Sequence, residues 1–270
     1  MRIYQPARGV GAALQENSYI VTDDFGTEIG FGGLTGRMLS RMYPERPLSL
    51  EMTFDAQAPA ADMLFGALTA RAERIRAANG GAPARLFTRC QVNDMERQEY
   101  FARMGFDSFD GTELFVLNVE KHRGGLRGYP PAGTKSIDVD LTSRARREQF
   151  LLRLASYGAP EHASEWLEER MRGQVFVARA VYSGSDLAGE ILVTGTPREA
   201  NLELICTTPK WRGRGTATAL IGEAETVLES QGVPWLTARA ERRNGNATRL
   251  FQRNGFDWVR TEELLLGQNM

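Results

Sequence analysis

Cysteine and histidine are scarce in this chain, and their scarcity limits the chemistry open to it. The 270 residues include two cysteines, Cys90 and Cys206, and two histidines, His122 and His162. Both cysteines lie in strand-like segments, so we expect buried free thiols in a reducing compartment and no disulfide framework. With no cluster of cysteines and histidines, we expect no zinc site and no metal cofactor.

The sequence also lacks an excess of either charge and lacks long apolar segments. Its 33 basic and 34 acidic residues leave a net charge of -1, so composition gives no general attraction to nucleic acid or to an anionic membrane. No apolar run is long enough to cross a bilayer, and the first residues do not have the profile of a signal peptide. We therefore expect a cytoplasmic protein with neither nucleic acid nor membrane as a partner.

The sequence repeats itself once. Residues 84–115 (ARLFTRCQVNDMERQEYFARMGFDSFDGTELF) align without a gap with residues 234–265 (PWLTARAERRNGNATRLFQRNGFDWVRTEELL). Gly105 aligns with Gly255, and the same offset of 150 residues aligns Phe101 with Phe251. Because a match of this length is hard to obtain by chance, we infer two copies of one α/β module.

A segment rich in glycine and proline separates the two copies. His122 to Thr134 (HRGGLRGYPPAGT) has no apolar periodicity and is typical of an interdomain linker. We therefore expect a first domain at residues 1–120, a linker at 121–134 and a second domain at 135–270. In the alternative interpretation, the arginines of this segment form a binding patch.

The strongest functional signal runs from Leu202 to Ala224. A strand-like stretch ends near Thr207, the loop Arg212-Gly213-Arg214-Gly215-Thr216-Ala217 follows, and an amphipathic helix begins there. Free backbone N–H groups and the helix dipole at such a start favour an anion, glycine allows close approach, and the arginines add forked donors. A basic turn that contacts nucleic acid is the alternative. The first copy has FDAQAPAAD at this place, without glycine or a basic residue.

This loop and a second block together resemble the acetyl-coenzyme A site of the GNAT acyltransferase superfamily. The loop fits the pattern Arg/Gln-x-x-Gly-x-Gly/Ala without a gap. The second block, Asn-x-x-Ala-x-x-Leu-Tyr-x-x-x-Gly-Phe, is met at Asn244, Ala247, Leu250, Gly255 and Phe256, with Phe251 at the tyrosine position. The resemblance covers roughly residues 135 to 266, and the first half resembles the same family more faintly.

The resemblance implies an α/β (α+β) fold of two GNAT-like modules, each a mixed, mostly antiparallel twisted sheet flanked by helices, with a degenerate first copy. It implies an acetyl-CoA-dependent N-acyltransferase, in which a small-molecule or peptide amine attacks the thioester directly in a ternary complex. The alternative is a CoA-binding sensor or interaction module without transferase activity. The sequence does not indicate the acceptor or the oligomeric state.

The resemblance also implies the residues of the site. Backbone N–H groups of the loop would hold the pyrophosphate of acetyl-CoA, and the arginines would assist. The main chain of Ile205 and Thr207 would pair with the pantetheine arm, and one such N–H would face the thioester carbonyl. Asn244 would approach the pantetheine and Phe251 the sulfur. The predicted coenzyme-binding residues are thus Ile205, Thr207, Arg212, Gly213, Arg214, Gly215, Thr216, Ala217, Asn244 and Phe251.

Two side chains bear on proton transfer. Phe251 cannot protonate a leaving thiolate as a tyrosine can, although a thiol pKa near ~8.5 makes the thiolate a tolerable leaving group; alternatively, Phe251 belongs to the core, like Phe101. An amine acceptor with a pKa near ~10.4 must lose a proton before attack. Glu203 is the candidate catalytic base and Glu190 the second candidate; the alternative for each is a solvated strand residue.

Overall fold

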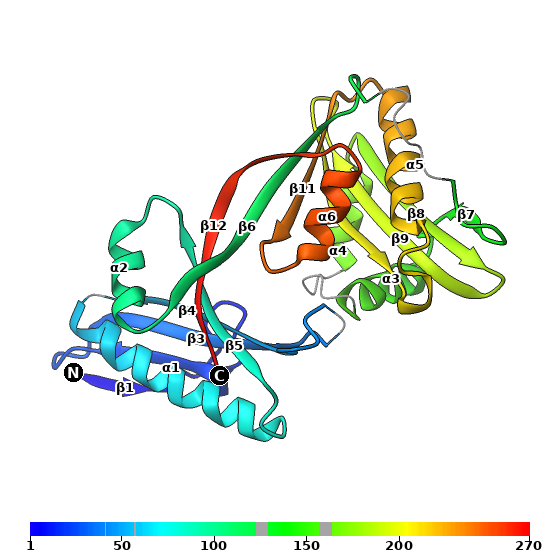
Figure 1. Ribbon diagram of the computed structural model, residues 1–270. Coiled ribbons are helices and arrows are strands. Elements are labelled where there is room, and N and C mark those ends of the chain that lie inside the picture. Colours follow the sequence, from blue (N-terminus) through cyan, green and yellow to red (C-terminus); the bar gives the residue numbers. More distant parts are fainter. Residues whose placement is uncertain (41, 57, 123–128, 157–163) are drawn as a thin grey trace. The chain divides into compact units, whose positions relative to one another are not determined.

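A computed structural model of the chain describes residues 1–270 except 41, 57, 123–128 and 157–163 (Figure 1). His162, residues 123–128 of the predicted linker, and Gln57 of the segment FDAQAPAAD therefore lie outside the described residues. Contacts divide the chain into unit 1, Met1–Thr112 with Glu262–Met270, and unit 2, Glu113–Thr261. Strands β6 (Asp107–Asn118) and β12 (Asp257–Asn269) each have residues in both units. The domain limits expected from the sequence follow the repeat, whereas these units follow the contacts.

Unit 1 is a mixed, mostly antiparallel sheet with one long helix against it, as predicted (Figure 1). Its strands run in the order β1-β2-β3-β4-β5-β12, and only β4 and β5 pair in parallel. Apolar residues alternate along β4, and they pack against Leu64 and Leu68 of α1 in one core. The elements are β1 (Arg2–Tyr4), η1 (Gln15–Asn17), β2 (Ser18–Thr22), β3 (Glu28–Met38), β4 (Leu48–Ala56), α1 (Ala58–Ala78), β5 (Ala84–Gln91) and α2 (Met95–Arg103).

Unit 2 has the same kind of sheet, with strand order β6-β11-β10-β9-β8-β7, in which β10 and β11 pair in parallel. Strand β7 is followed by two helices, whereas β1 of unit 1 is followed only by the 3-10 turn η1. The elements are β7 (Lys135–Asp138), α3 (Arg144–Ser156), α4 (Ser164–Met171), β8 (Val175–Ser183), β9 (Asp186–Gly195), β10 (Ala200–Thr207), η2 (Pro209–Trp211), α5 (Thr216–Ser230), β11 (Trp235–Glu241) and α6 (Gly245–Arg253).

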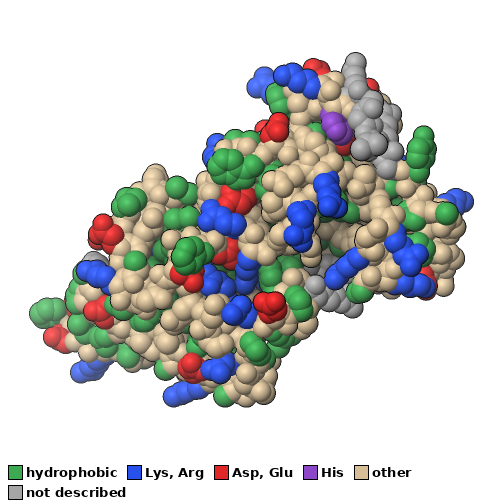
Figure 2. Space-filling view, viewed as in Figure 1, with side chains coloured by type: hydrophobic (Ala, Val, Ile, Leu, Met, Phe, Trp, Pro, Cys, Tyr) green, Lys and Arg blue, Asp and Glu red, His purple; other side chains and the backbone are tan. Residues whose placement is uncertain are grey.

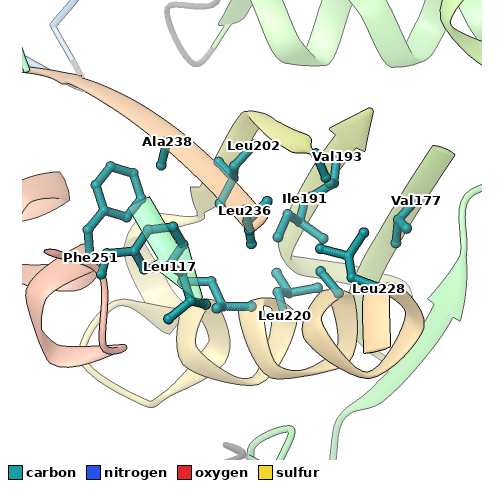
Figure 3. Packing of buried hydrophobic residues seen from close by; sticks show 14 of the residues in the cluster. Leu117, Val177, Ile191, Val193, Leu202, Leu220, Leu228, Leu236, Ala238 and Phe251 are labelled. Carbon is teal, nitrogen blue, oxygen red and sulfur yellow. The ribbon is translucent and has the colours of Figure 1, made fainter. Parts of the chain in front are cut away.

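Helices cover both faces of the sheet in unit 2, and strand β9 shows why. Because successive side chains of a strand point to opposite faces, Ile191 joins the core beneath Leu220 of α5, whereas Leu192 joins a second core with Phe150 of α3. Figure 3 shows the first core, where Leu220 and Leu228 of α5 meet Ile191. Each fully buried leucine contributes about 1.5–3 kcal/mol, so both helix layers stabilise β9, the strand that pairs with β10.

The internal repeat appears in the structure with the offset expected from the sequence. Helix α2 starts at Met95 and α6 at Gly245, and both span nine residues. Their N-caps match, since Asp94 accepts a hydrogen bond from the backbone N–H of Arg97, and Asn244 accepts one from that of Ala247. These are equivalent local structures, and the prediction of two related copies over this stretch is confirmed.

Candidate functional site

The candidate site begins where two parallel strands of unit 2 stop pairing. Strands β10 and β11 pair only at Ala200–Leu202, although β10 continues to Thr207. Ile205 and Thr207, predicted to meet the pantetheine arm, lie beyond this pairing, on a stretch that is bound to β9 along its other edge, and both are half-buried. Backbone N–H and C=O groups that leave a ladder need new partners, and an extended ligand with amide groups can supply them in the manner of an added strand.

A loop rich in positive φ angles follows β10 and leads into α5. Gly213 has φ of 72° and Gly215, the N-cap of α5, has φ of 85°, a region in which other residues are strained. Gly215 brings no capping side chain, and the first turn of α5 has no acidic residue. A Cβ atom built at Gly213 or Gly215 would find no atom within 4 Å. The helix start is therefore open to a ligand, and its N–H groups and dipole favour an anion.

Two side chains of this loop strengthen the case for a phosphate ligand. The guanidinium of Arg214 lies 5.3 Å from the ring centre of Trp211, whose side chain is buried. The hydroxyl of Thr216, a residue only 1% exposed, has no hydrogen-bond partner among the described residues. A buried polar atom without a partner is costly unless a ligand or water satisfies it, so the loop fits the pyrophosphate expected there. Sequence reasoning missed Trp211, although it directly precedes Arg212.

Asn244 and Phe251 belong to the helix after β11. Asn244 caps α6, and its Oδ1 lies 3.2 Å from the backbone N of Ala247. Phe251 is 2% exposed and packs against Phe115 and Phe256, at ring-centre distances of 5.4 and 5.3 Å. Figure 3 shows the ring inside the core beside Leu117. The structure thus gives Phe251 a packing role like that of Phe101, and its contact with the sulfur stays a prediction.

Glu203 lies at an irregular point of β10, because the register with β9 shifts between Leu202 and Leu204. Its Oε1 accepts a hydrogen bond of 2.6 Å from the hydroxyl of Thr194 and lies 3.7 Å from Nε of Arg170 on α4. Both contacts use the same oxygen, and Oε2 accepts no hydrogen bond from the described residues. The side chain is 22% exposed, so both the role of a base and the alternative, a solvated strand residue, stay predictions.

Glu190, the second candidate base, is fully buried on β9. The guanidinium of Arg153 on α3 approaches both carboxylate oxygens at 3.3–3.4 Å. Burial raises the pKa of Glu190, and the positive charge of Arg153 opposes the rise only in part. Since Glu190 contacts α3 and Glu203 contacts α4, both carboxylates lie on the sheet face opposite α5.

Three further features of the described residues bear on other kinds of site: the distribution of charge, the metal ligands and the length of apolar helices. Acidic and basic side chains are interspersed on the face seen in Figure 2. In the described ranges, no group of three or more histidine, cysteine and acidic residues is placed to hold a metal ion. No described helix has the length and apolarity needed to cross a membrane.

Comparison with known proteins agrees with this geometry. Residues 171–257 match the family model described as "Acetyltransferase (GNAT) domain", whereas a comparison with curated protein sequences finds no significant match. The fold resembles a GCN5-related N-acetyltransferase from Sphaerobacter thermophilus (TM-score 0.52, 16% identity, 96% of this chain and 82% of that one). It also resembles a conserved protein of unknown function, probable N-acyltransferase, from Enterococcus faecalis V583 (TM-score 0.53, 12% identity, 93% and 61%). Residues 171–257 of this chain therefore match a GNAT acetyltransferase domain, and the chain has a GNAT fold.

Proposed function

We propose that the chain is an acetyl-CoA-dependent N-acyltransferase whose coenzyme lies in unit 2. The observation that carries the proposal is the combination, at one end of β10, of a freed strand edge and an open, glycine-capped helix start. The family match supports acyl transfer in general, and these two features supply what a pyrophosphate and an amide-bearing arm require.

Each part of the site would contribute a different interaction. The backbone from Arg212 to Ala217 would hold the pyrophosphate, with Arg214 positioned by its stacking on Trp211. The main chain of Ile205 and Thr207 would hold the arm, and Asn244 would lie beside it. Bound acetyl-CoA supplies an activated acyl group; a donor N–H of β10 directed at its carbonyl oxygen would stabilise the negative charge that develops during attack.

Glu203 is the base that we propose for the amine acceptor. A base needs a free oxygen within reach of the acceptor, and Oε2 of Glu203 meets the first condition on a partly exposed side chain. Glu190 is fully buried, and Arg153 engages both of its oxygens. The amine, either a small molecule or a peptide, would then attack the thioester directly in a ternary complex.

Release of free thiol from acetyl-CoA in the presence of a broad amine panel tests the proposal. We expect turnover with at least one amine, and a fall in kcat of about 10²–10⁴-fold in Glu203→Gln. Glu199→Gln, an exposed carboxylate just before β10, is the matched control and should keep the activity. Tight CoA binding without turnover of any amine would instead support a sensor or interaction module.

A further inference from the structure

The two units contain the same strand geometry, but only one of them leaves it open. In unit 1 the parallel strands β4 and β5 pair at Leu48–Glu51 and then stop pairing, although β4 continues to Ala56. In unit 2, β10 and β11 stop pairing after Leu202. Leu50 pairs with Leu86, and Ala200 pairs with Leu236, so the repeat offset also relates the two parted strand pairs.

The gap between the strands of unit 1 is filled by an arginine of the same chain. Arg97, on α2, donates one hydrogen bond of 3.1 Å to the carbonyl oxygen of Phe54 on β4 and one of 3.2 Å to the hydroxyl of Thr88 on β5. Its guanidinium also lies 5.5 Å from the ring centre of Phe54 and 5.4 Å from that of Phe101. One side chain thus bridges both strands where their own ladder has ended, and it satisfies a main-chain acceptor of β4.

The corresponding residue in unit 2 is Ala247. Residues 97 and 247 occupy the same turn of equivalent helices, because the backbone N–H of each donates to its N-cap, at 3.1 Å for Arg97 and 3.2 Å for Ala247. The two side chains therefore leave their helices at the same point of the repeat. Alanine has no side-chain donor, so Ala247 cannot supply to β10 the hydrogen bond that Arg97 supplies to β4.

We infer that the residue at position 97 in unit 1, or 247 in unit 2, decides which strand pair accepts a ligand. Arg97 fills the space between β4 and β5, which would otherwise be a second slot for a pantetheine arm. Ala247 leaves the corresponding slot between β10 and β11 free. The inference rests on the proposed function for the identity of the arm. It assigns one coenzyme to each chain and names the side chain that excludes the second. It also implies that exchanging the two side chains exchanges the open slot.

Reciprocal substitution tests the inference, with CoA and pantetheine as probes. Ala247→Arg should weaken CoA binding at least 100-fold in calorimetric titration, whereas Gln252→Arg, which adds the same side chain at an exposed position of α6, should leave it unchanged. Ala247→Met, which fills the slot without charge, should weaken binding in the same direction, and thermal melting shows whether each variant is folded. CoA binding by folded Ala247→Arg and Ala247→Met with the wild-type affinity would overturn the assignment of the slot.

The converse change concerns unit 1 alone. Pantetheine has no phosphate that would need the missing loop, so its binding reports on the slot itself, and saturation-transfer NMR detects such binding at millimolar concentration. Ala247→Arg should show no saturation transfer to pantetheine, and the double variant Arg97→Ala with Ala247→Arg should show it again. No regain in a folded double variant would overturn the claim of a second slot. Failure of the wild-type protein to bind CoA would contradict the proposed function. The claim about Arg97 is then decided separately, by whether Arg97→Ala binds more pantetheine than wild type.

Discussion

The paired N-caps Asp94 and Asn244 allow stability and ligand binding to be separated in one molecule. Each accepts a hydrogen bond from the backbone N–H three residues later, at 3.1 Å in unit 1 and 3.2 Å in unit 2. The two caps are thus equivalent in the fold, but only Asn244 lies in the unit with the proposed coenzyme site. Alanine at either position removes the cap and leaves one helix donor without its acceptor.

The expected magnitudes follow from these contacts. Loss of an N-cap side chain costs about 1 kcal/mol of helix stability, within a range of ~0.5–2 kcal/mol, so Asp94→Ala and Asn244→Ala should destabilise α2 and α6 by similar amounts. If the amide of Asn244 also contacts the pantetheine arm, its loss removes a further ~0.5–1.5 kcal/mol of binding, which is about 2–13-fold in Kd. Asn244→Asp retains the cap, as Asp94 shows, but removes the amide donor.

Hydrogen exchange of α2 and α6, followed by calorimetric titration with CoA, measures the two effects separately. We expect faster exchange in α2 for Asp94→Ala and in α6 for Asn244→Ala, and weaker CoA binding only for Asn244→Ala and Asn244→Asp. Equal CoA affinity in wild type and both Asn244 variants would refute the placement of Asn244 beside the arm. Unchanged exchange in Asp94→Ala would refute the equivalence of the caps.

Three further predictions concern carboxylates and cores. Because burial raises the folded-state pKa of Glu190, its stabilising contribution is present below the unfolded-state pKa and is lost as pH rises through the folded-state pKa. Denaturation from pH 4 to 8 should therefore show wild type losing stability relative to Glu190→Gln, and parallel curves of stability against pH would contradict this. Phe251→Tyr should lower stability by ~1–3 kcal/mol, because the fully packed ring offers its hydroxyl no partner, and an unchanged melting temperature would mean that the hydroxyl reaches a partner or solvent. Leu266→Ala should cost ~2–5 kcal/mol and speed hydrogen exchange in β5, with which β12 pairs; faster exchange confined to unit 2 would contradict the assignment of Glu262–Met270 to unit 1.

Local patterns made much of the fold predictable. The matching of Gly105 with Gly255 and of Phe101 with Phe251 required only the alignment of the two halves, and the structure confirms it in equivalent helices and caps. The alternation of Leu48, Leu50, Met52 and Phe54 is likewise typical of a half-buried strand, and β4 lies there. These features depend on residues that are close in sequence, which is why the sequence reveals them.

Features that depend on contacts between residues far apart in the chain could not be predicted from the sequence. The assignment of Glu262–Met270 to unit 1 depends on pairing between β12 and β5, which lie far apart in the chain. The register shift that places Glu203, and the approach of Arg153 to Glu190, depend on how strands and helices stack. The sequence alignment already pairs Arg97 with Ala247, but the role of Arg97 becomes visible only when the structure shows where β4 and β5 stop pairing. No local periodicity records contacts of this kind.

Titration with CoA of wild type, Gly215→Asp and Gly232→Asp tests the central claim most directly. Gly215 and Gly232 flank α5 at its two ends, both have positive φ, and neither has an atom within 4 Å of a built Cβ. The two variants therefore carry similar strain and the same added charge, but only Gly215→Asp places a carboxylate where the pyrophosphate is proposed. At ~5 Å and an effective dielectric constant of ~20, the repulsion is about 3 kcal/mol, which corresponds to about 100-fold in Kd. We predict that loss for Gly215→Asp and wild-type affinity for Gly232→Asp; wild-type affinity in both would contradict the coenzyme site.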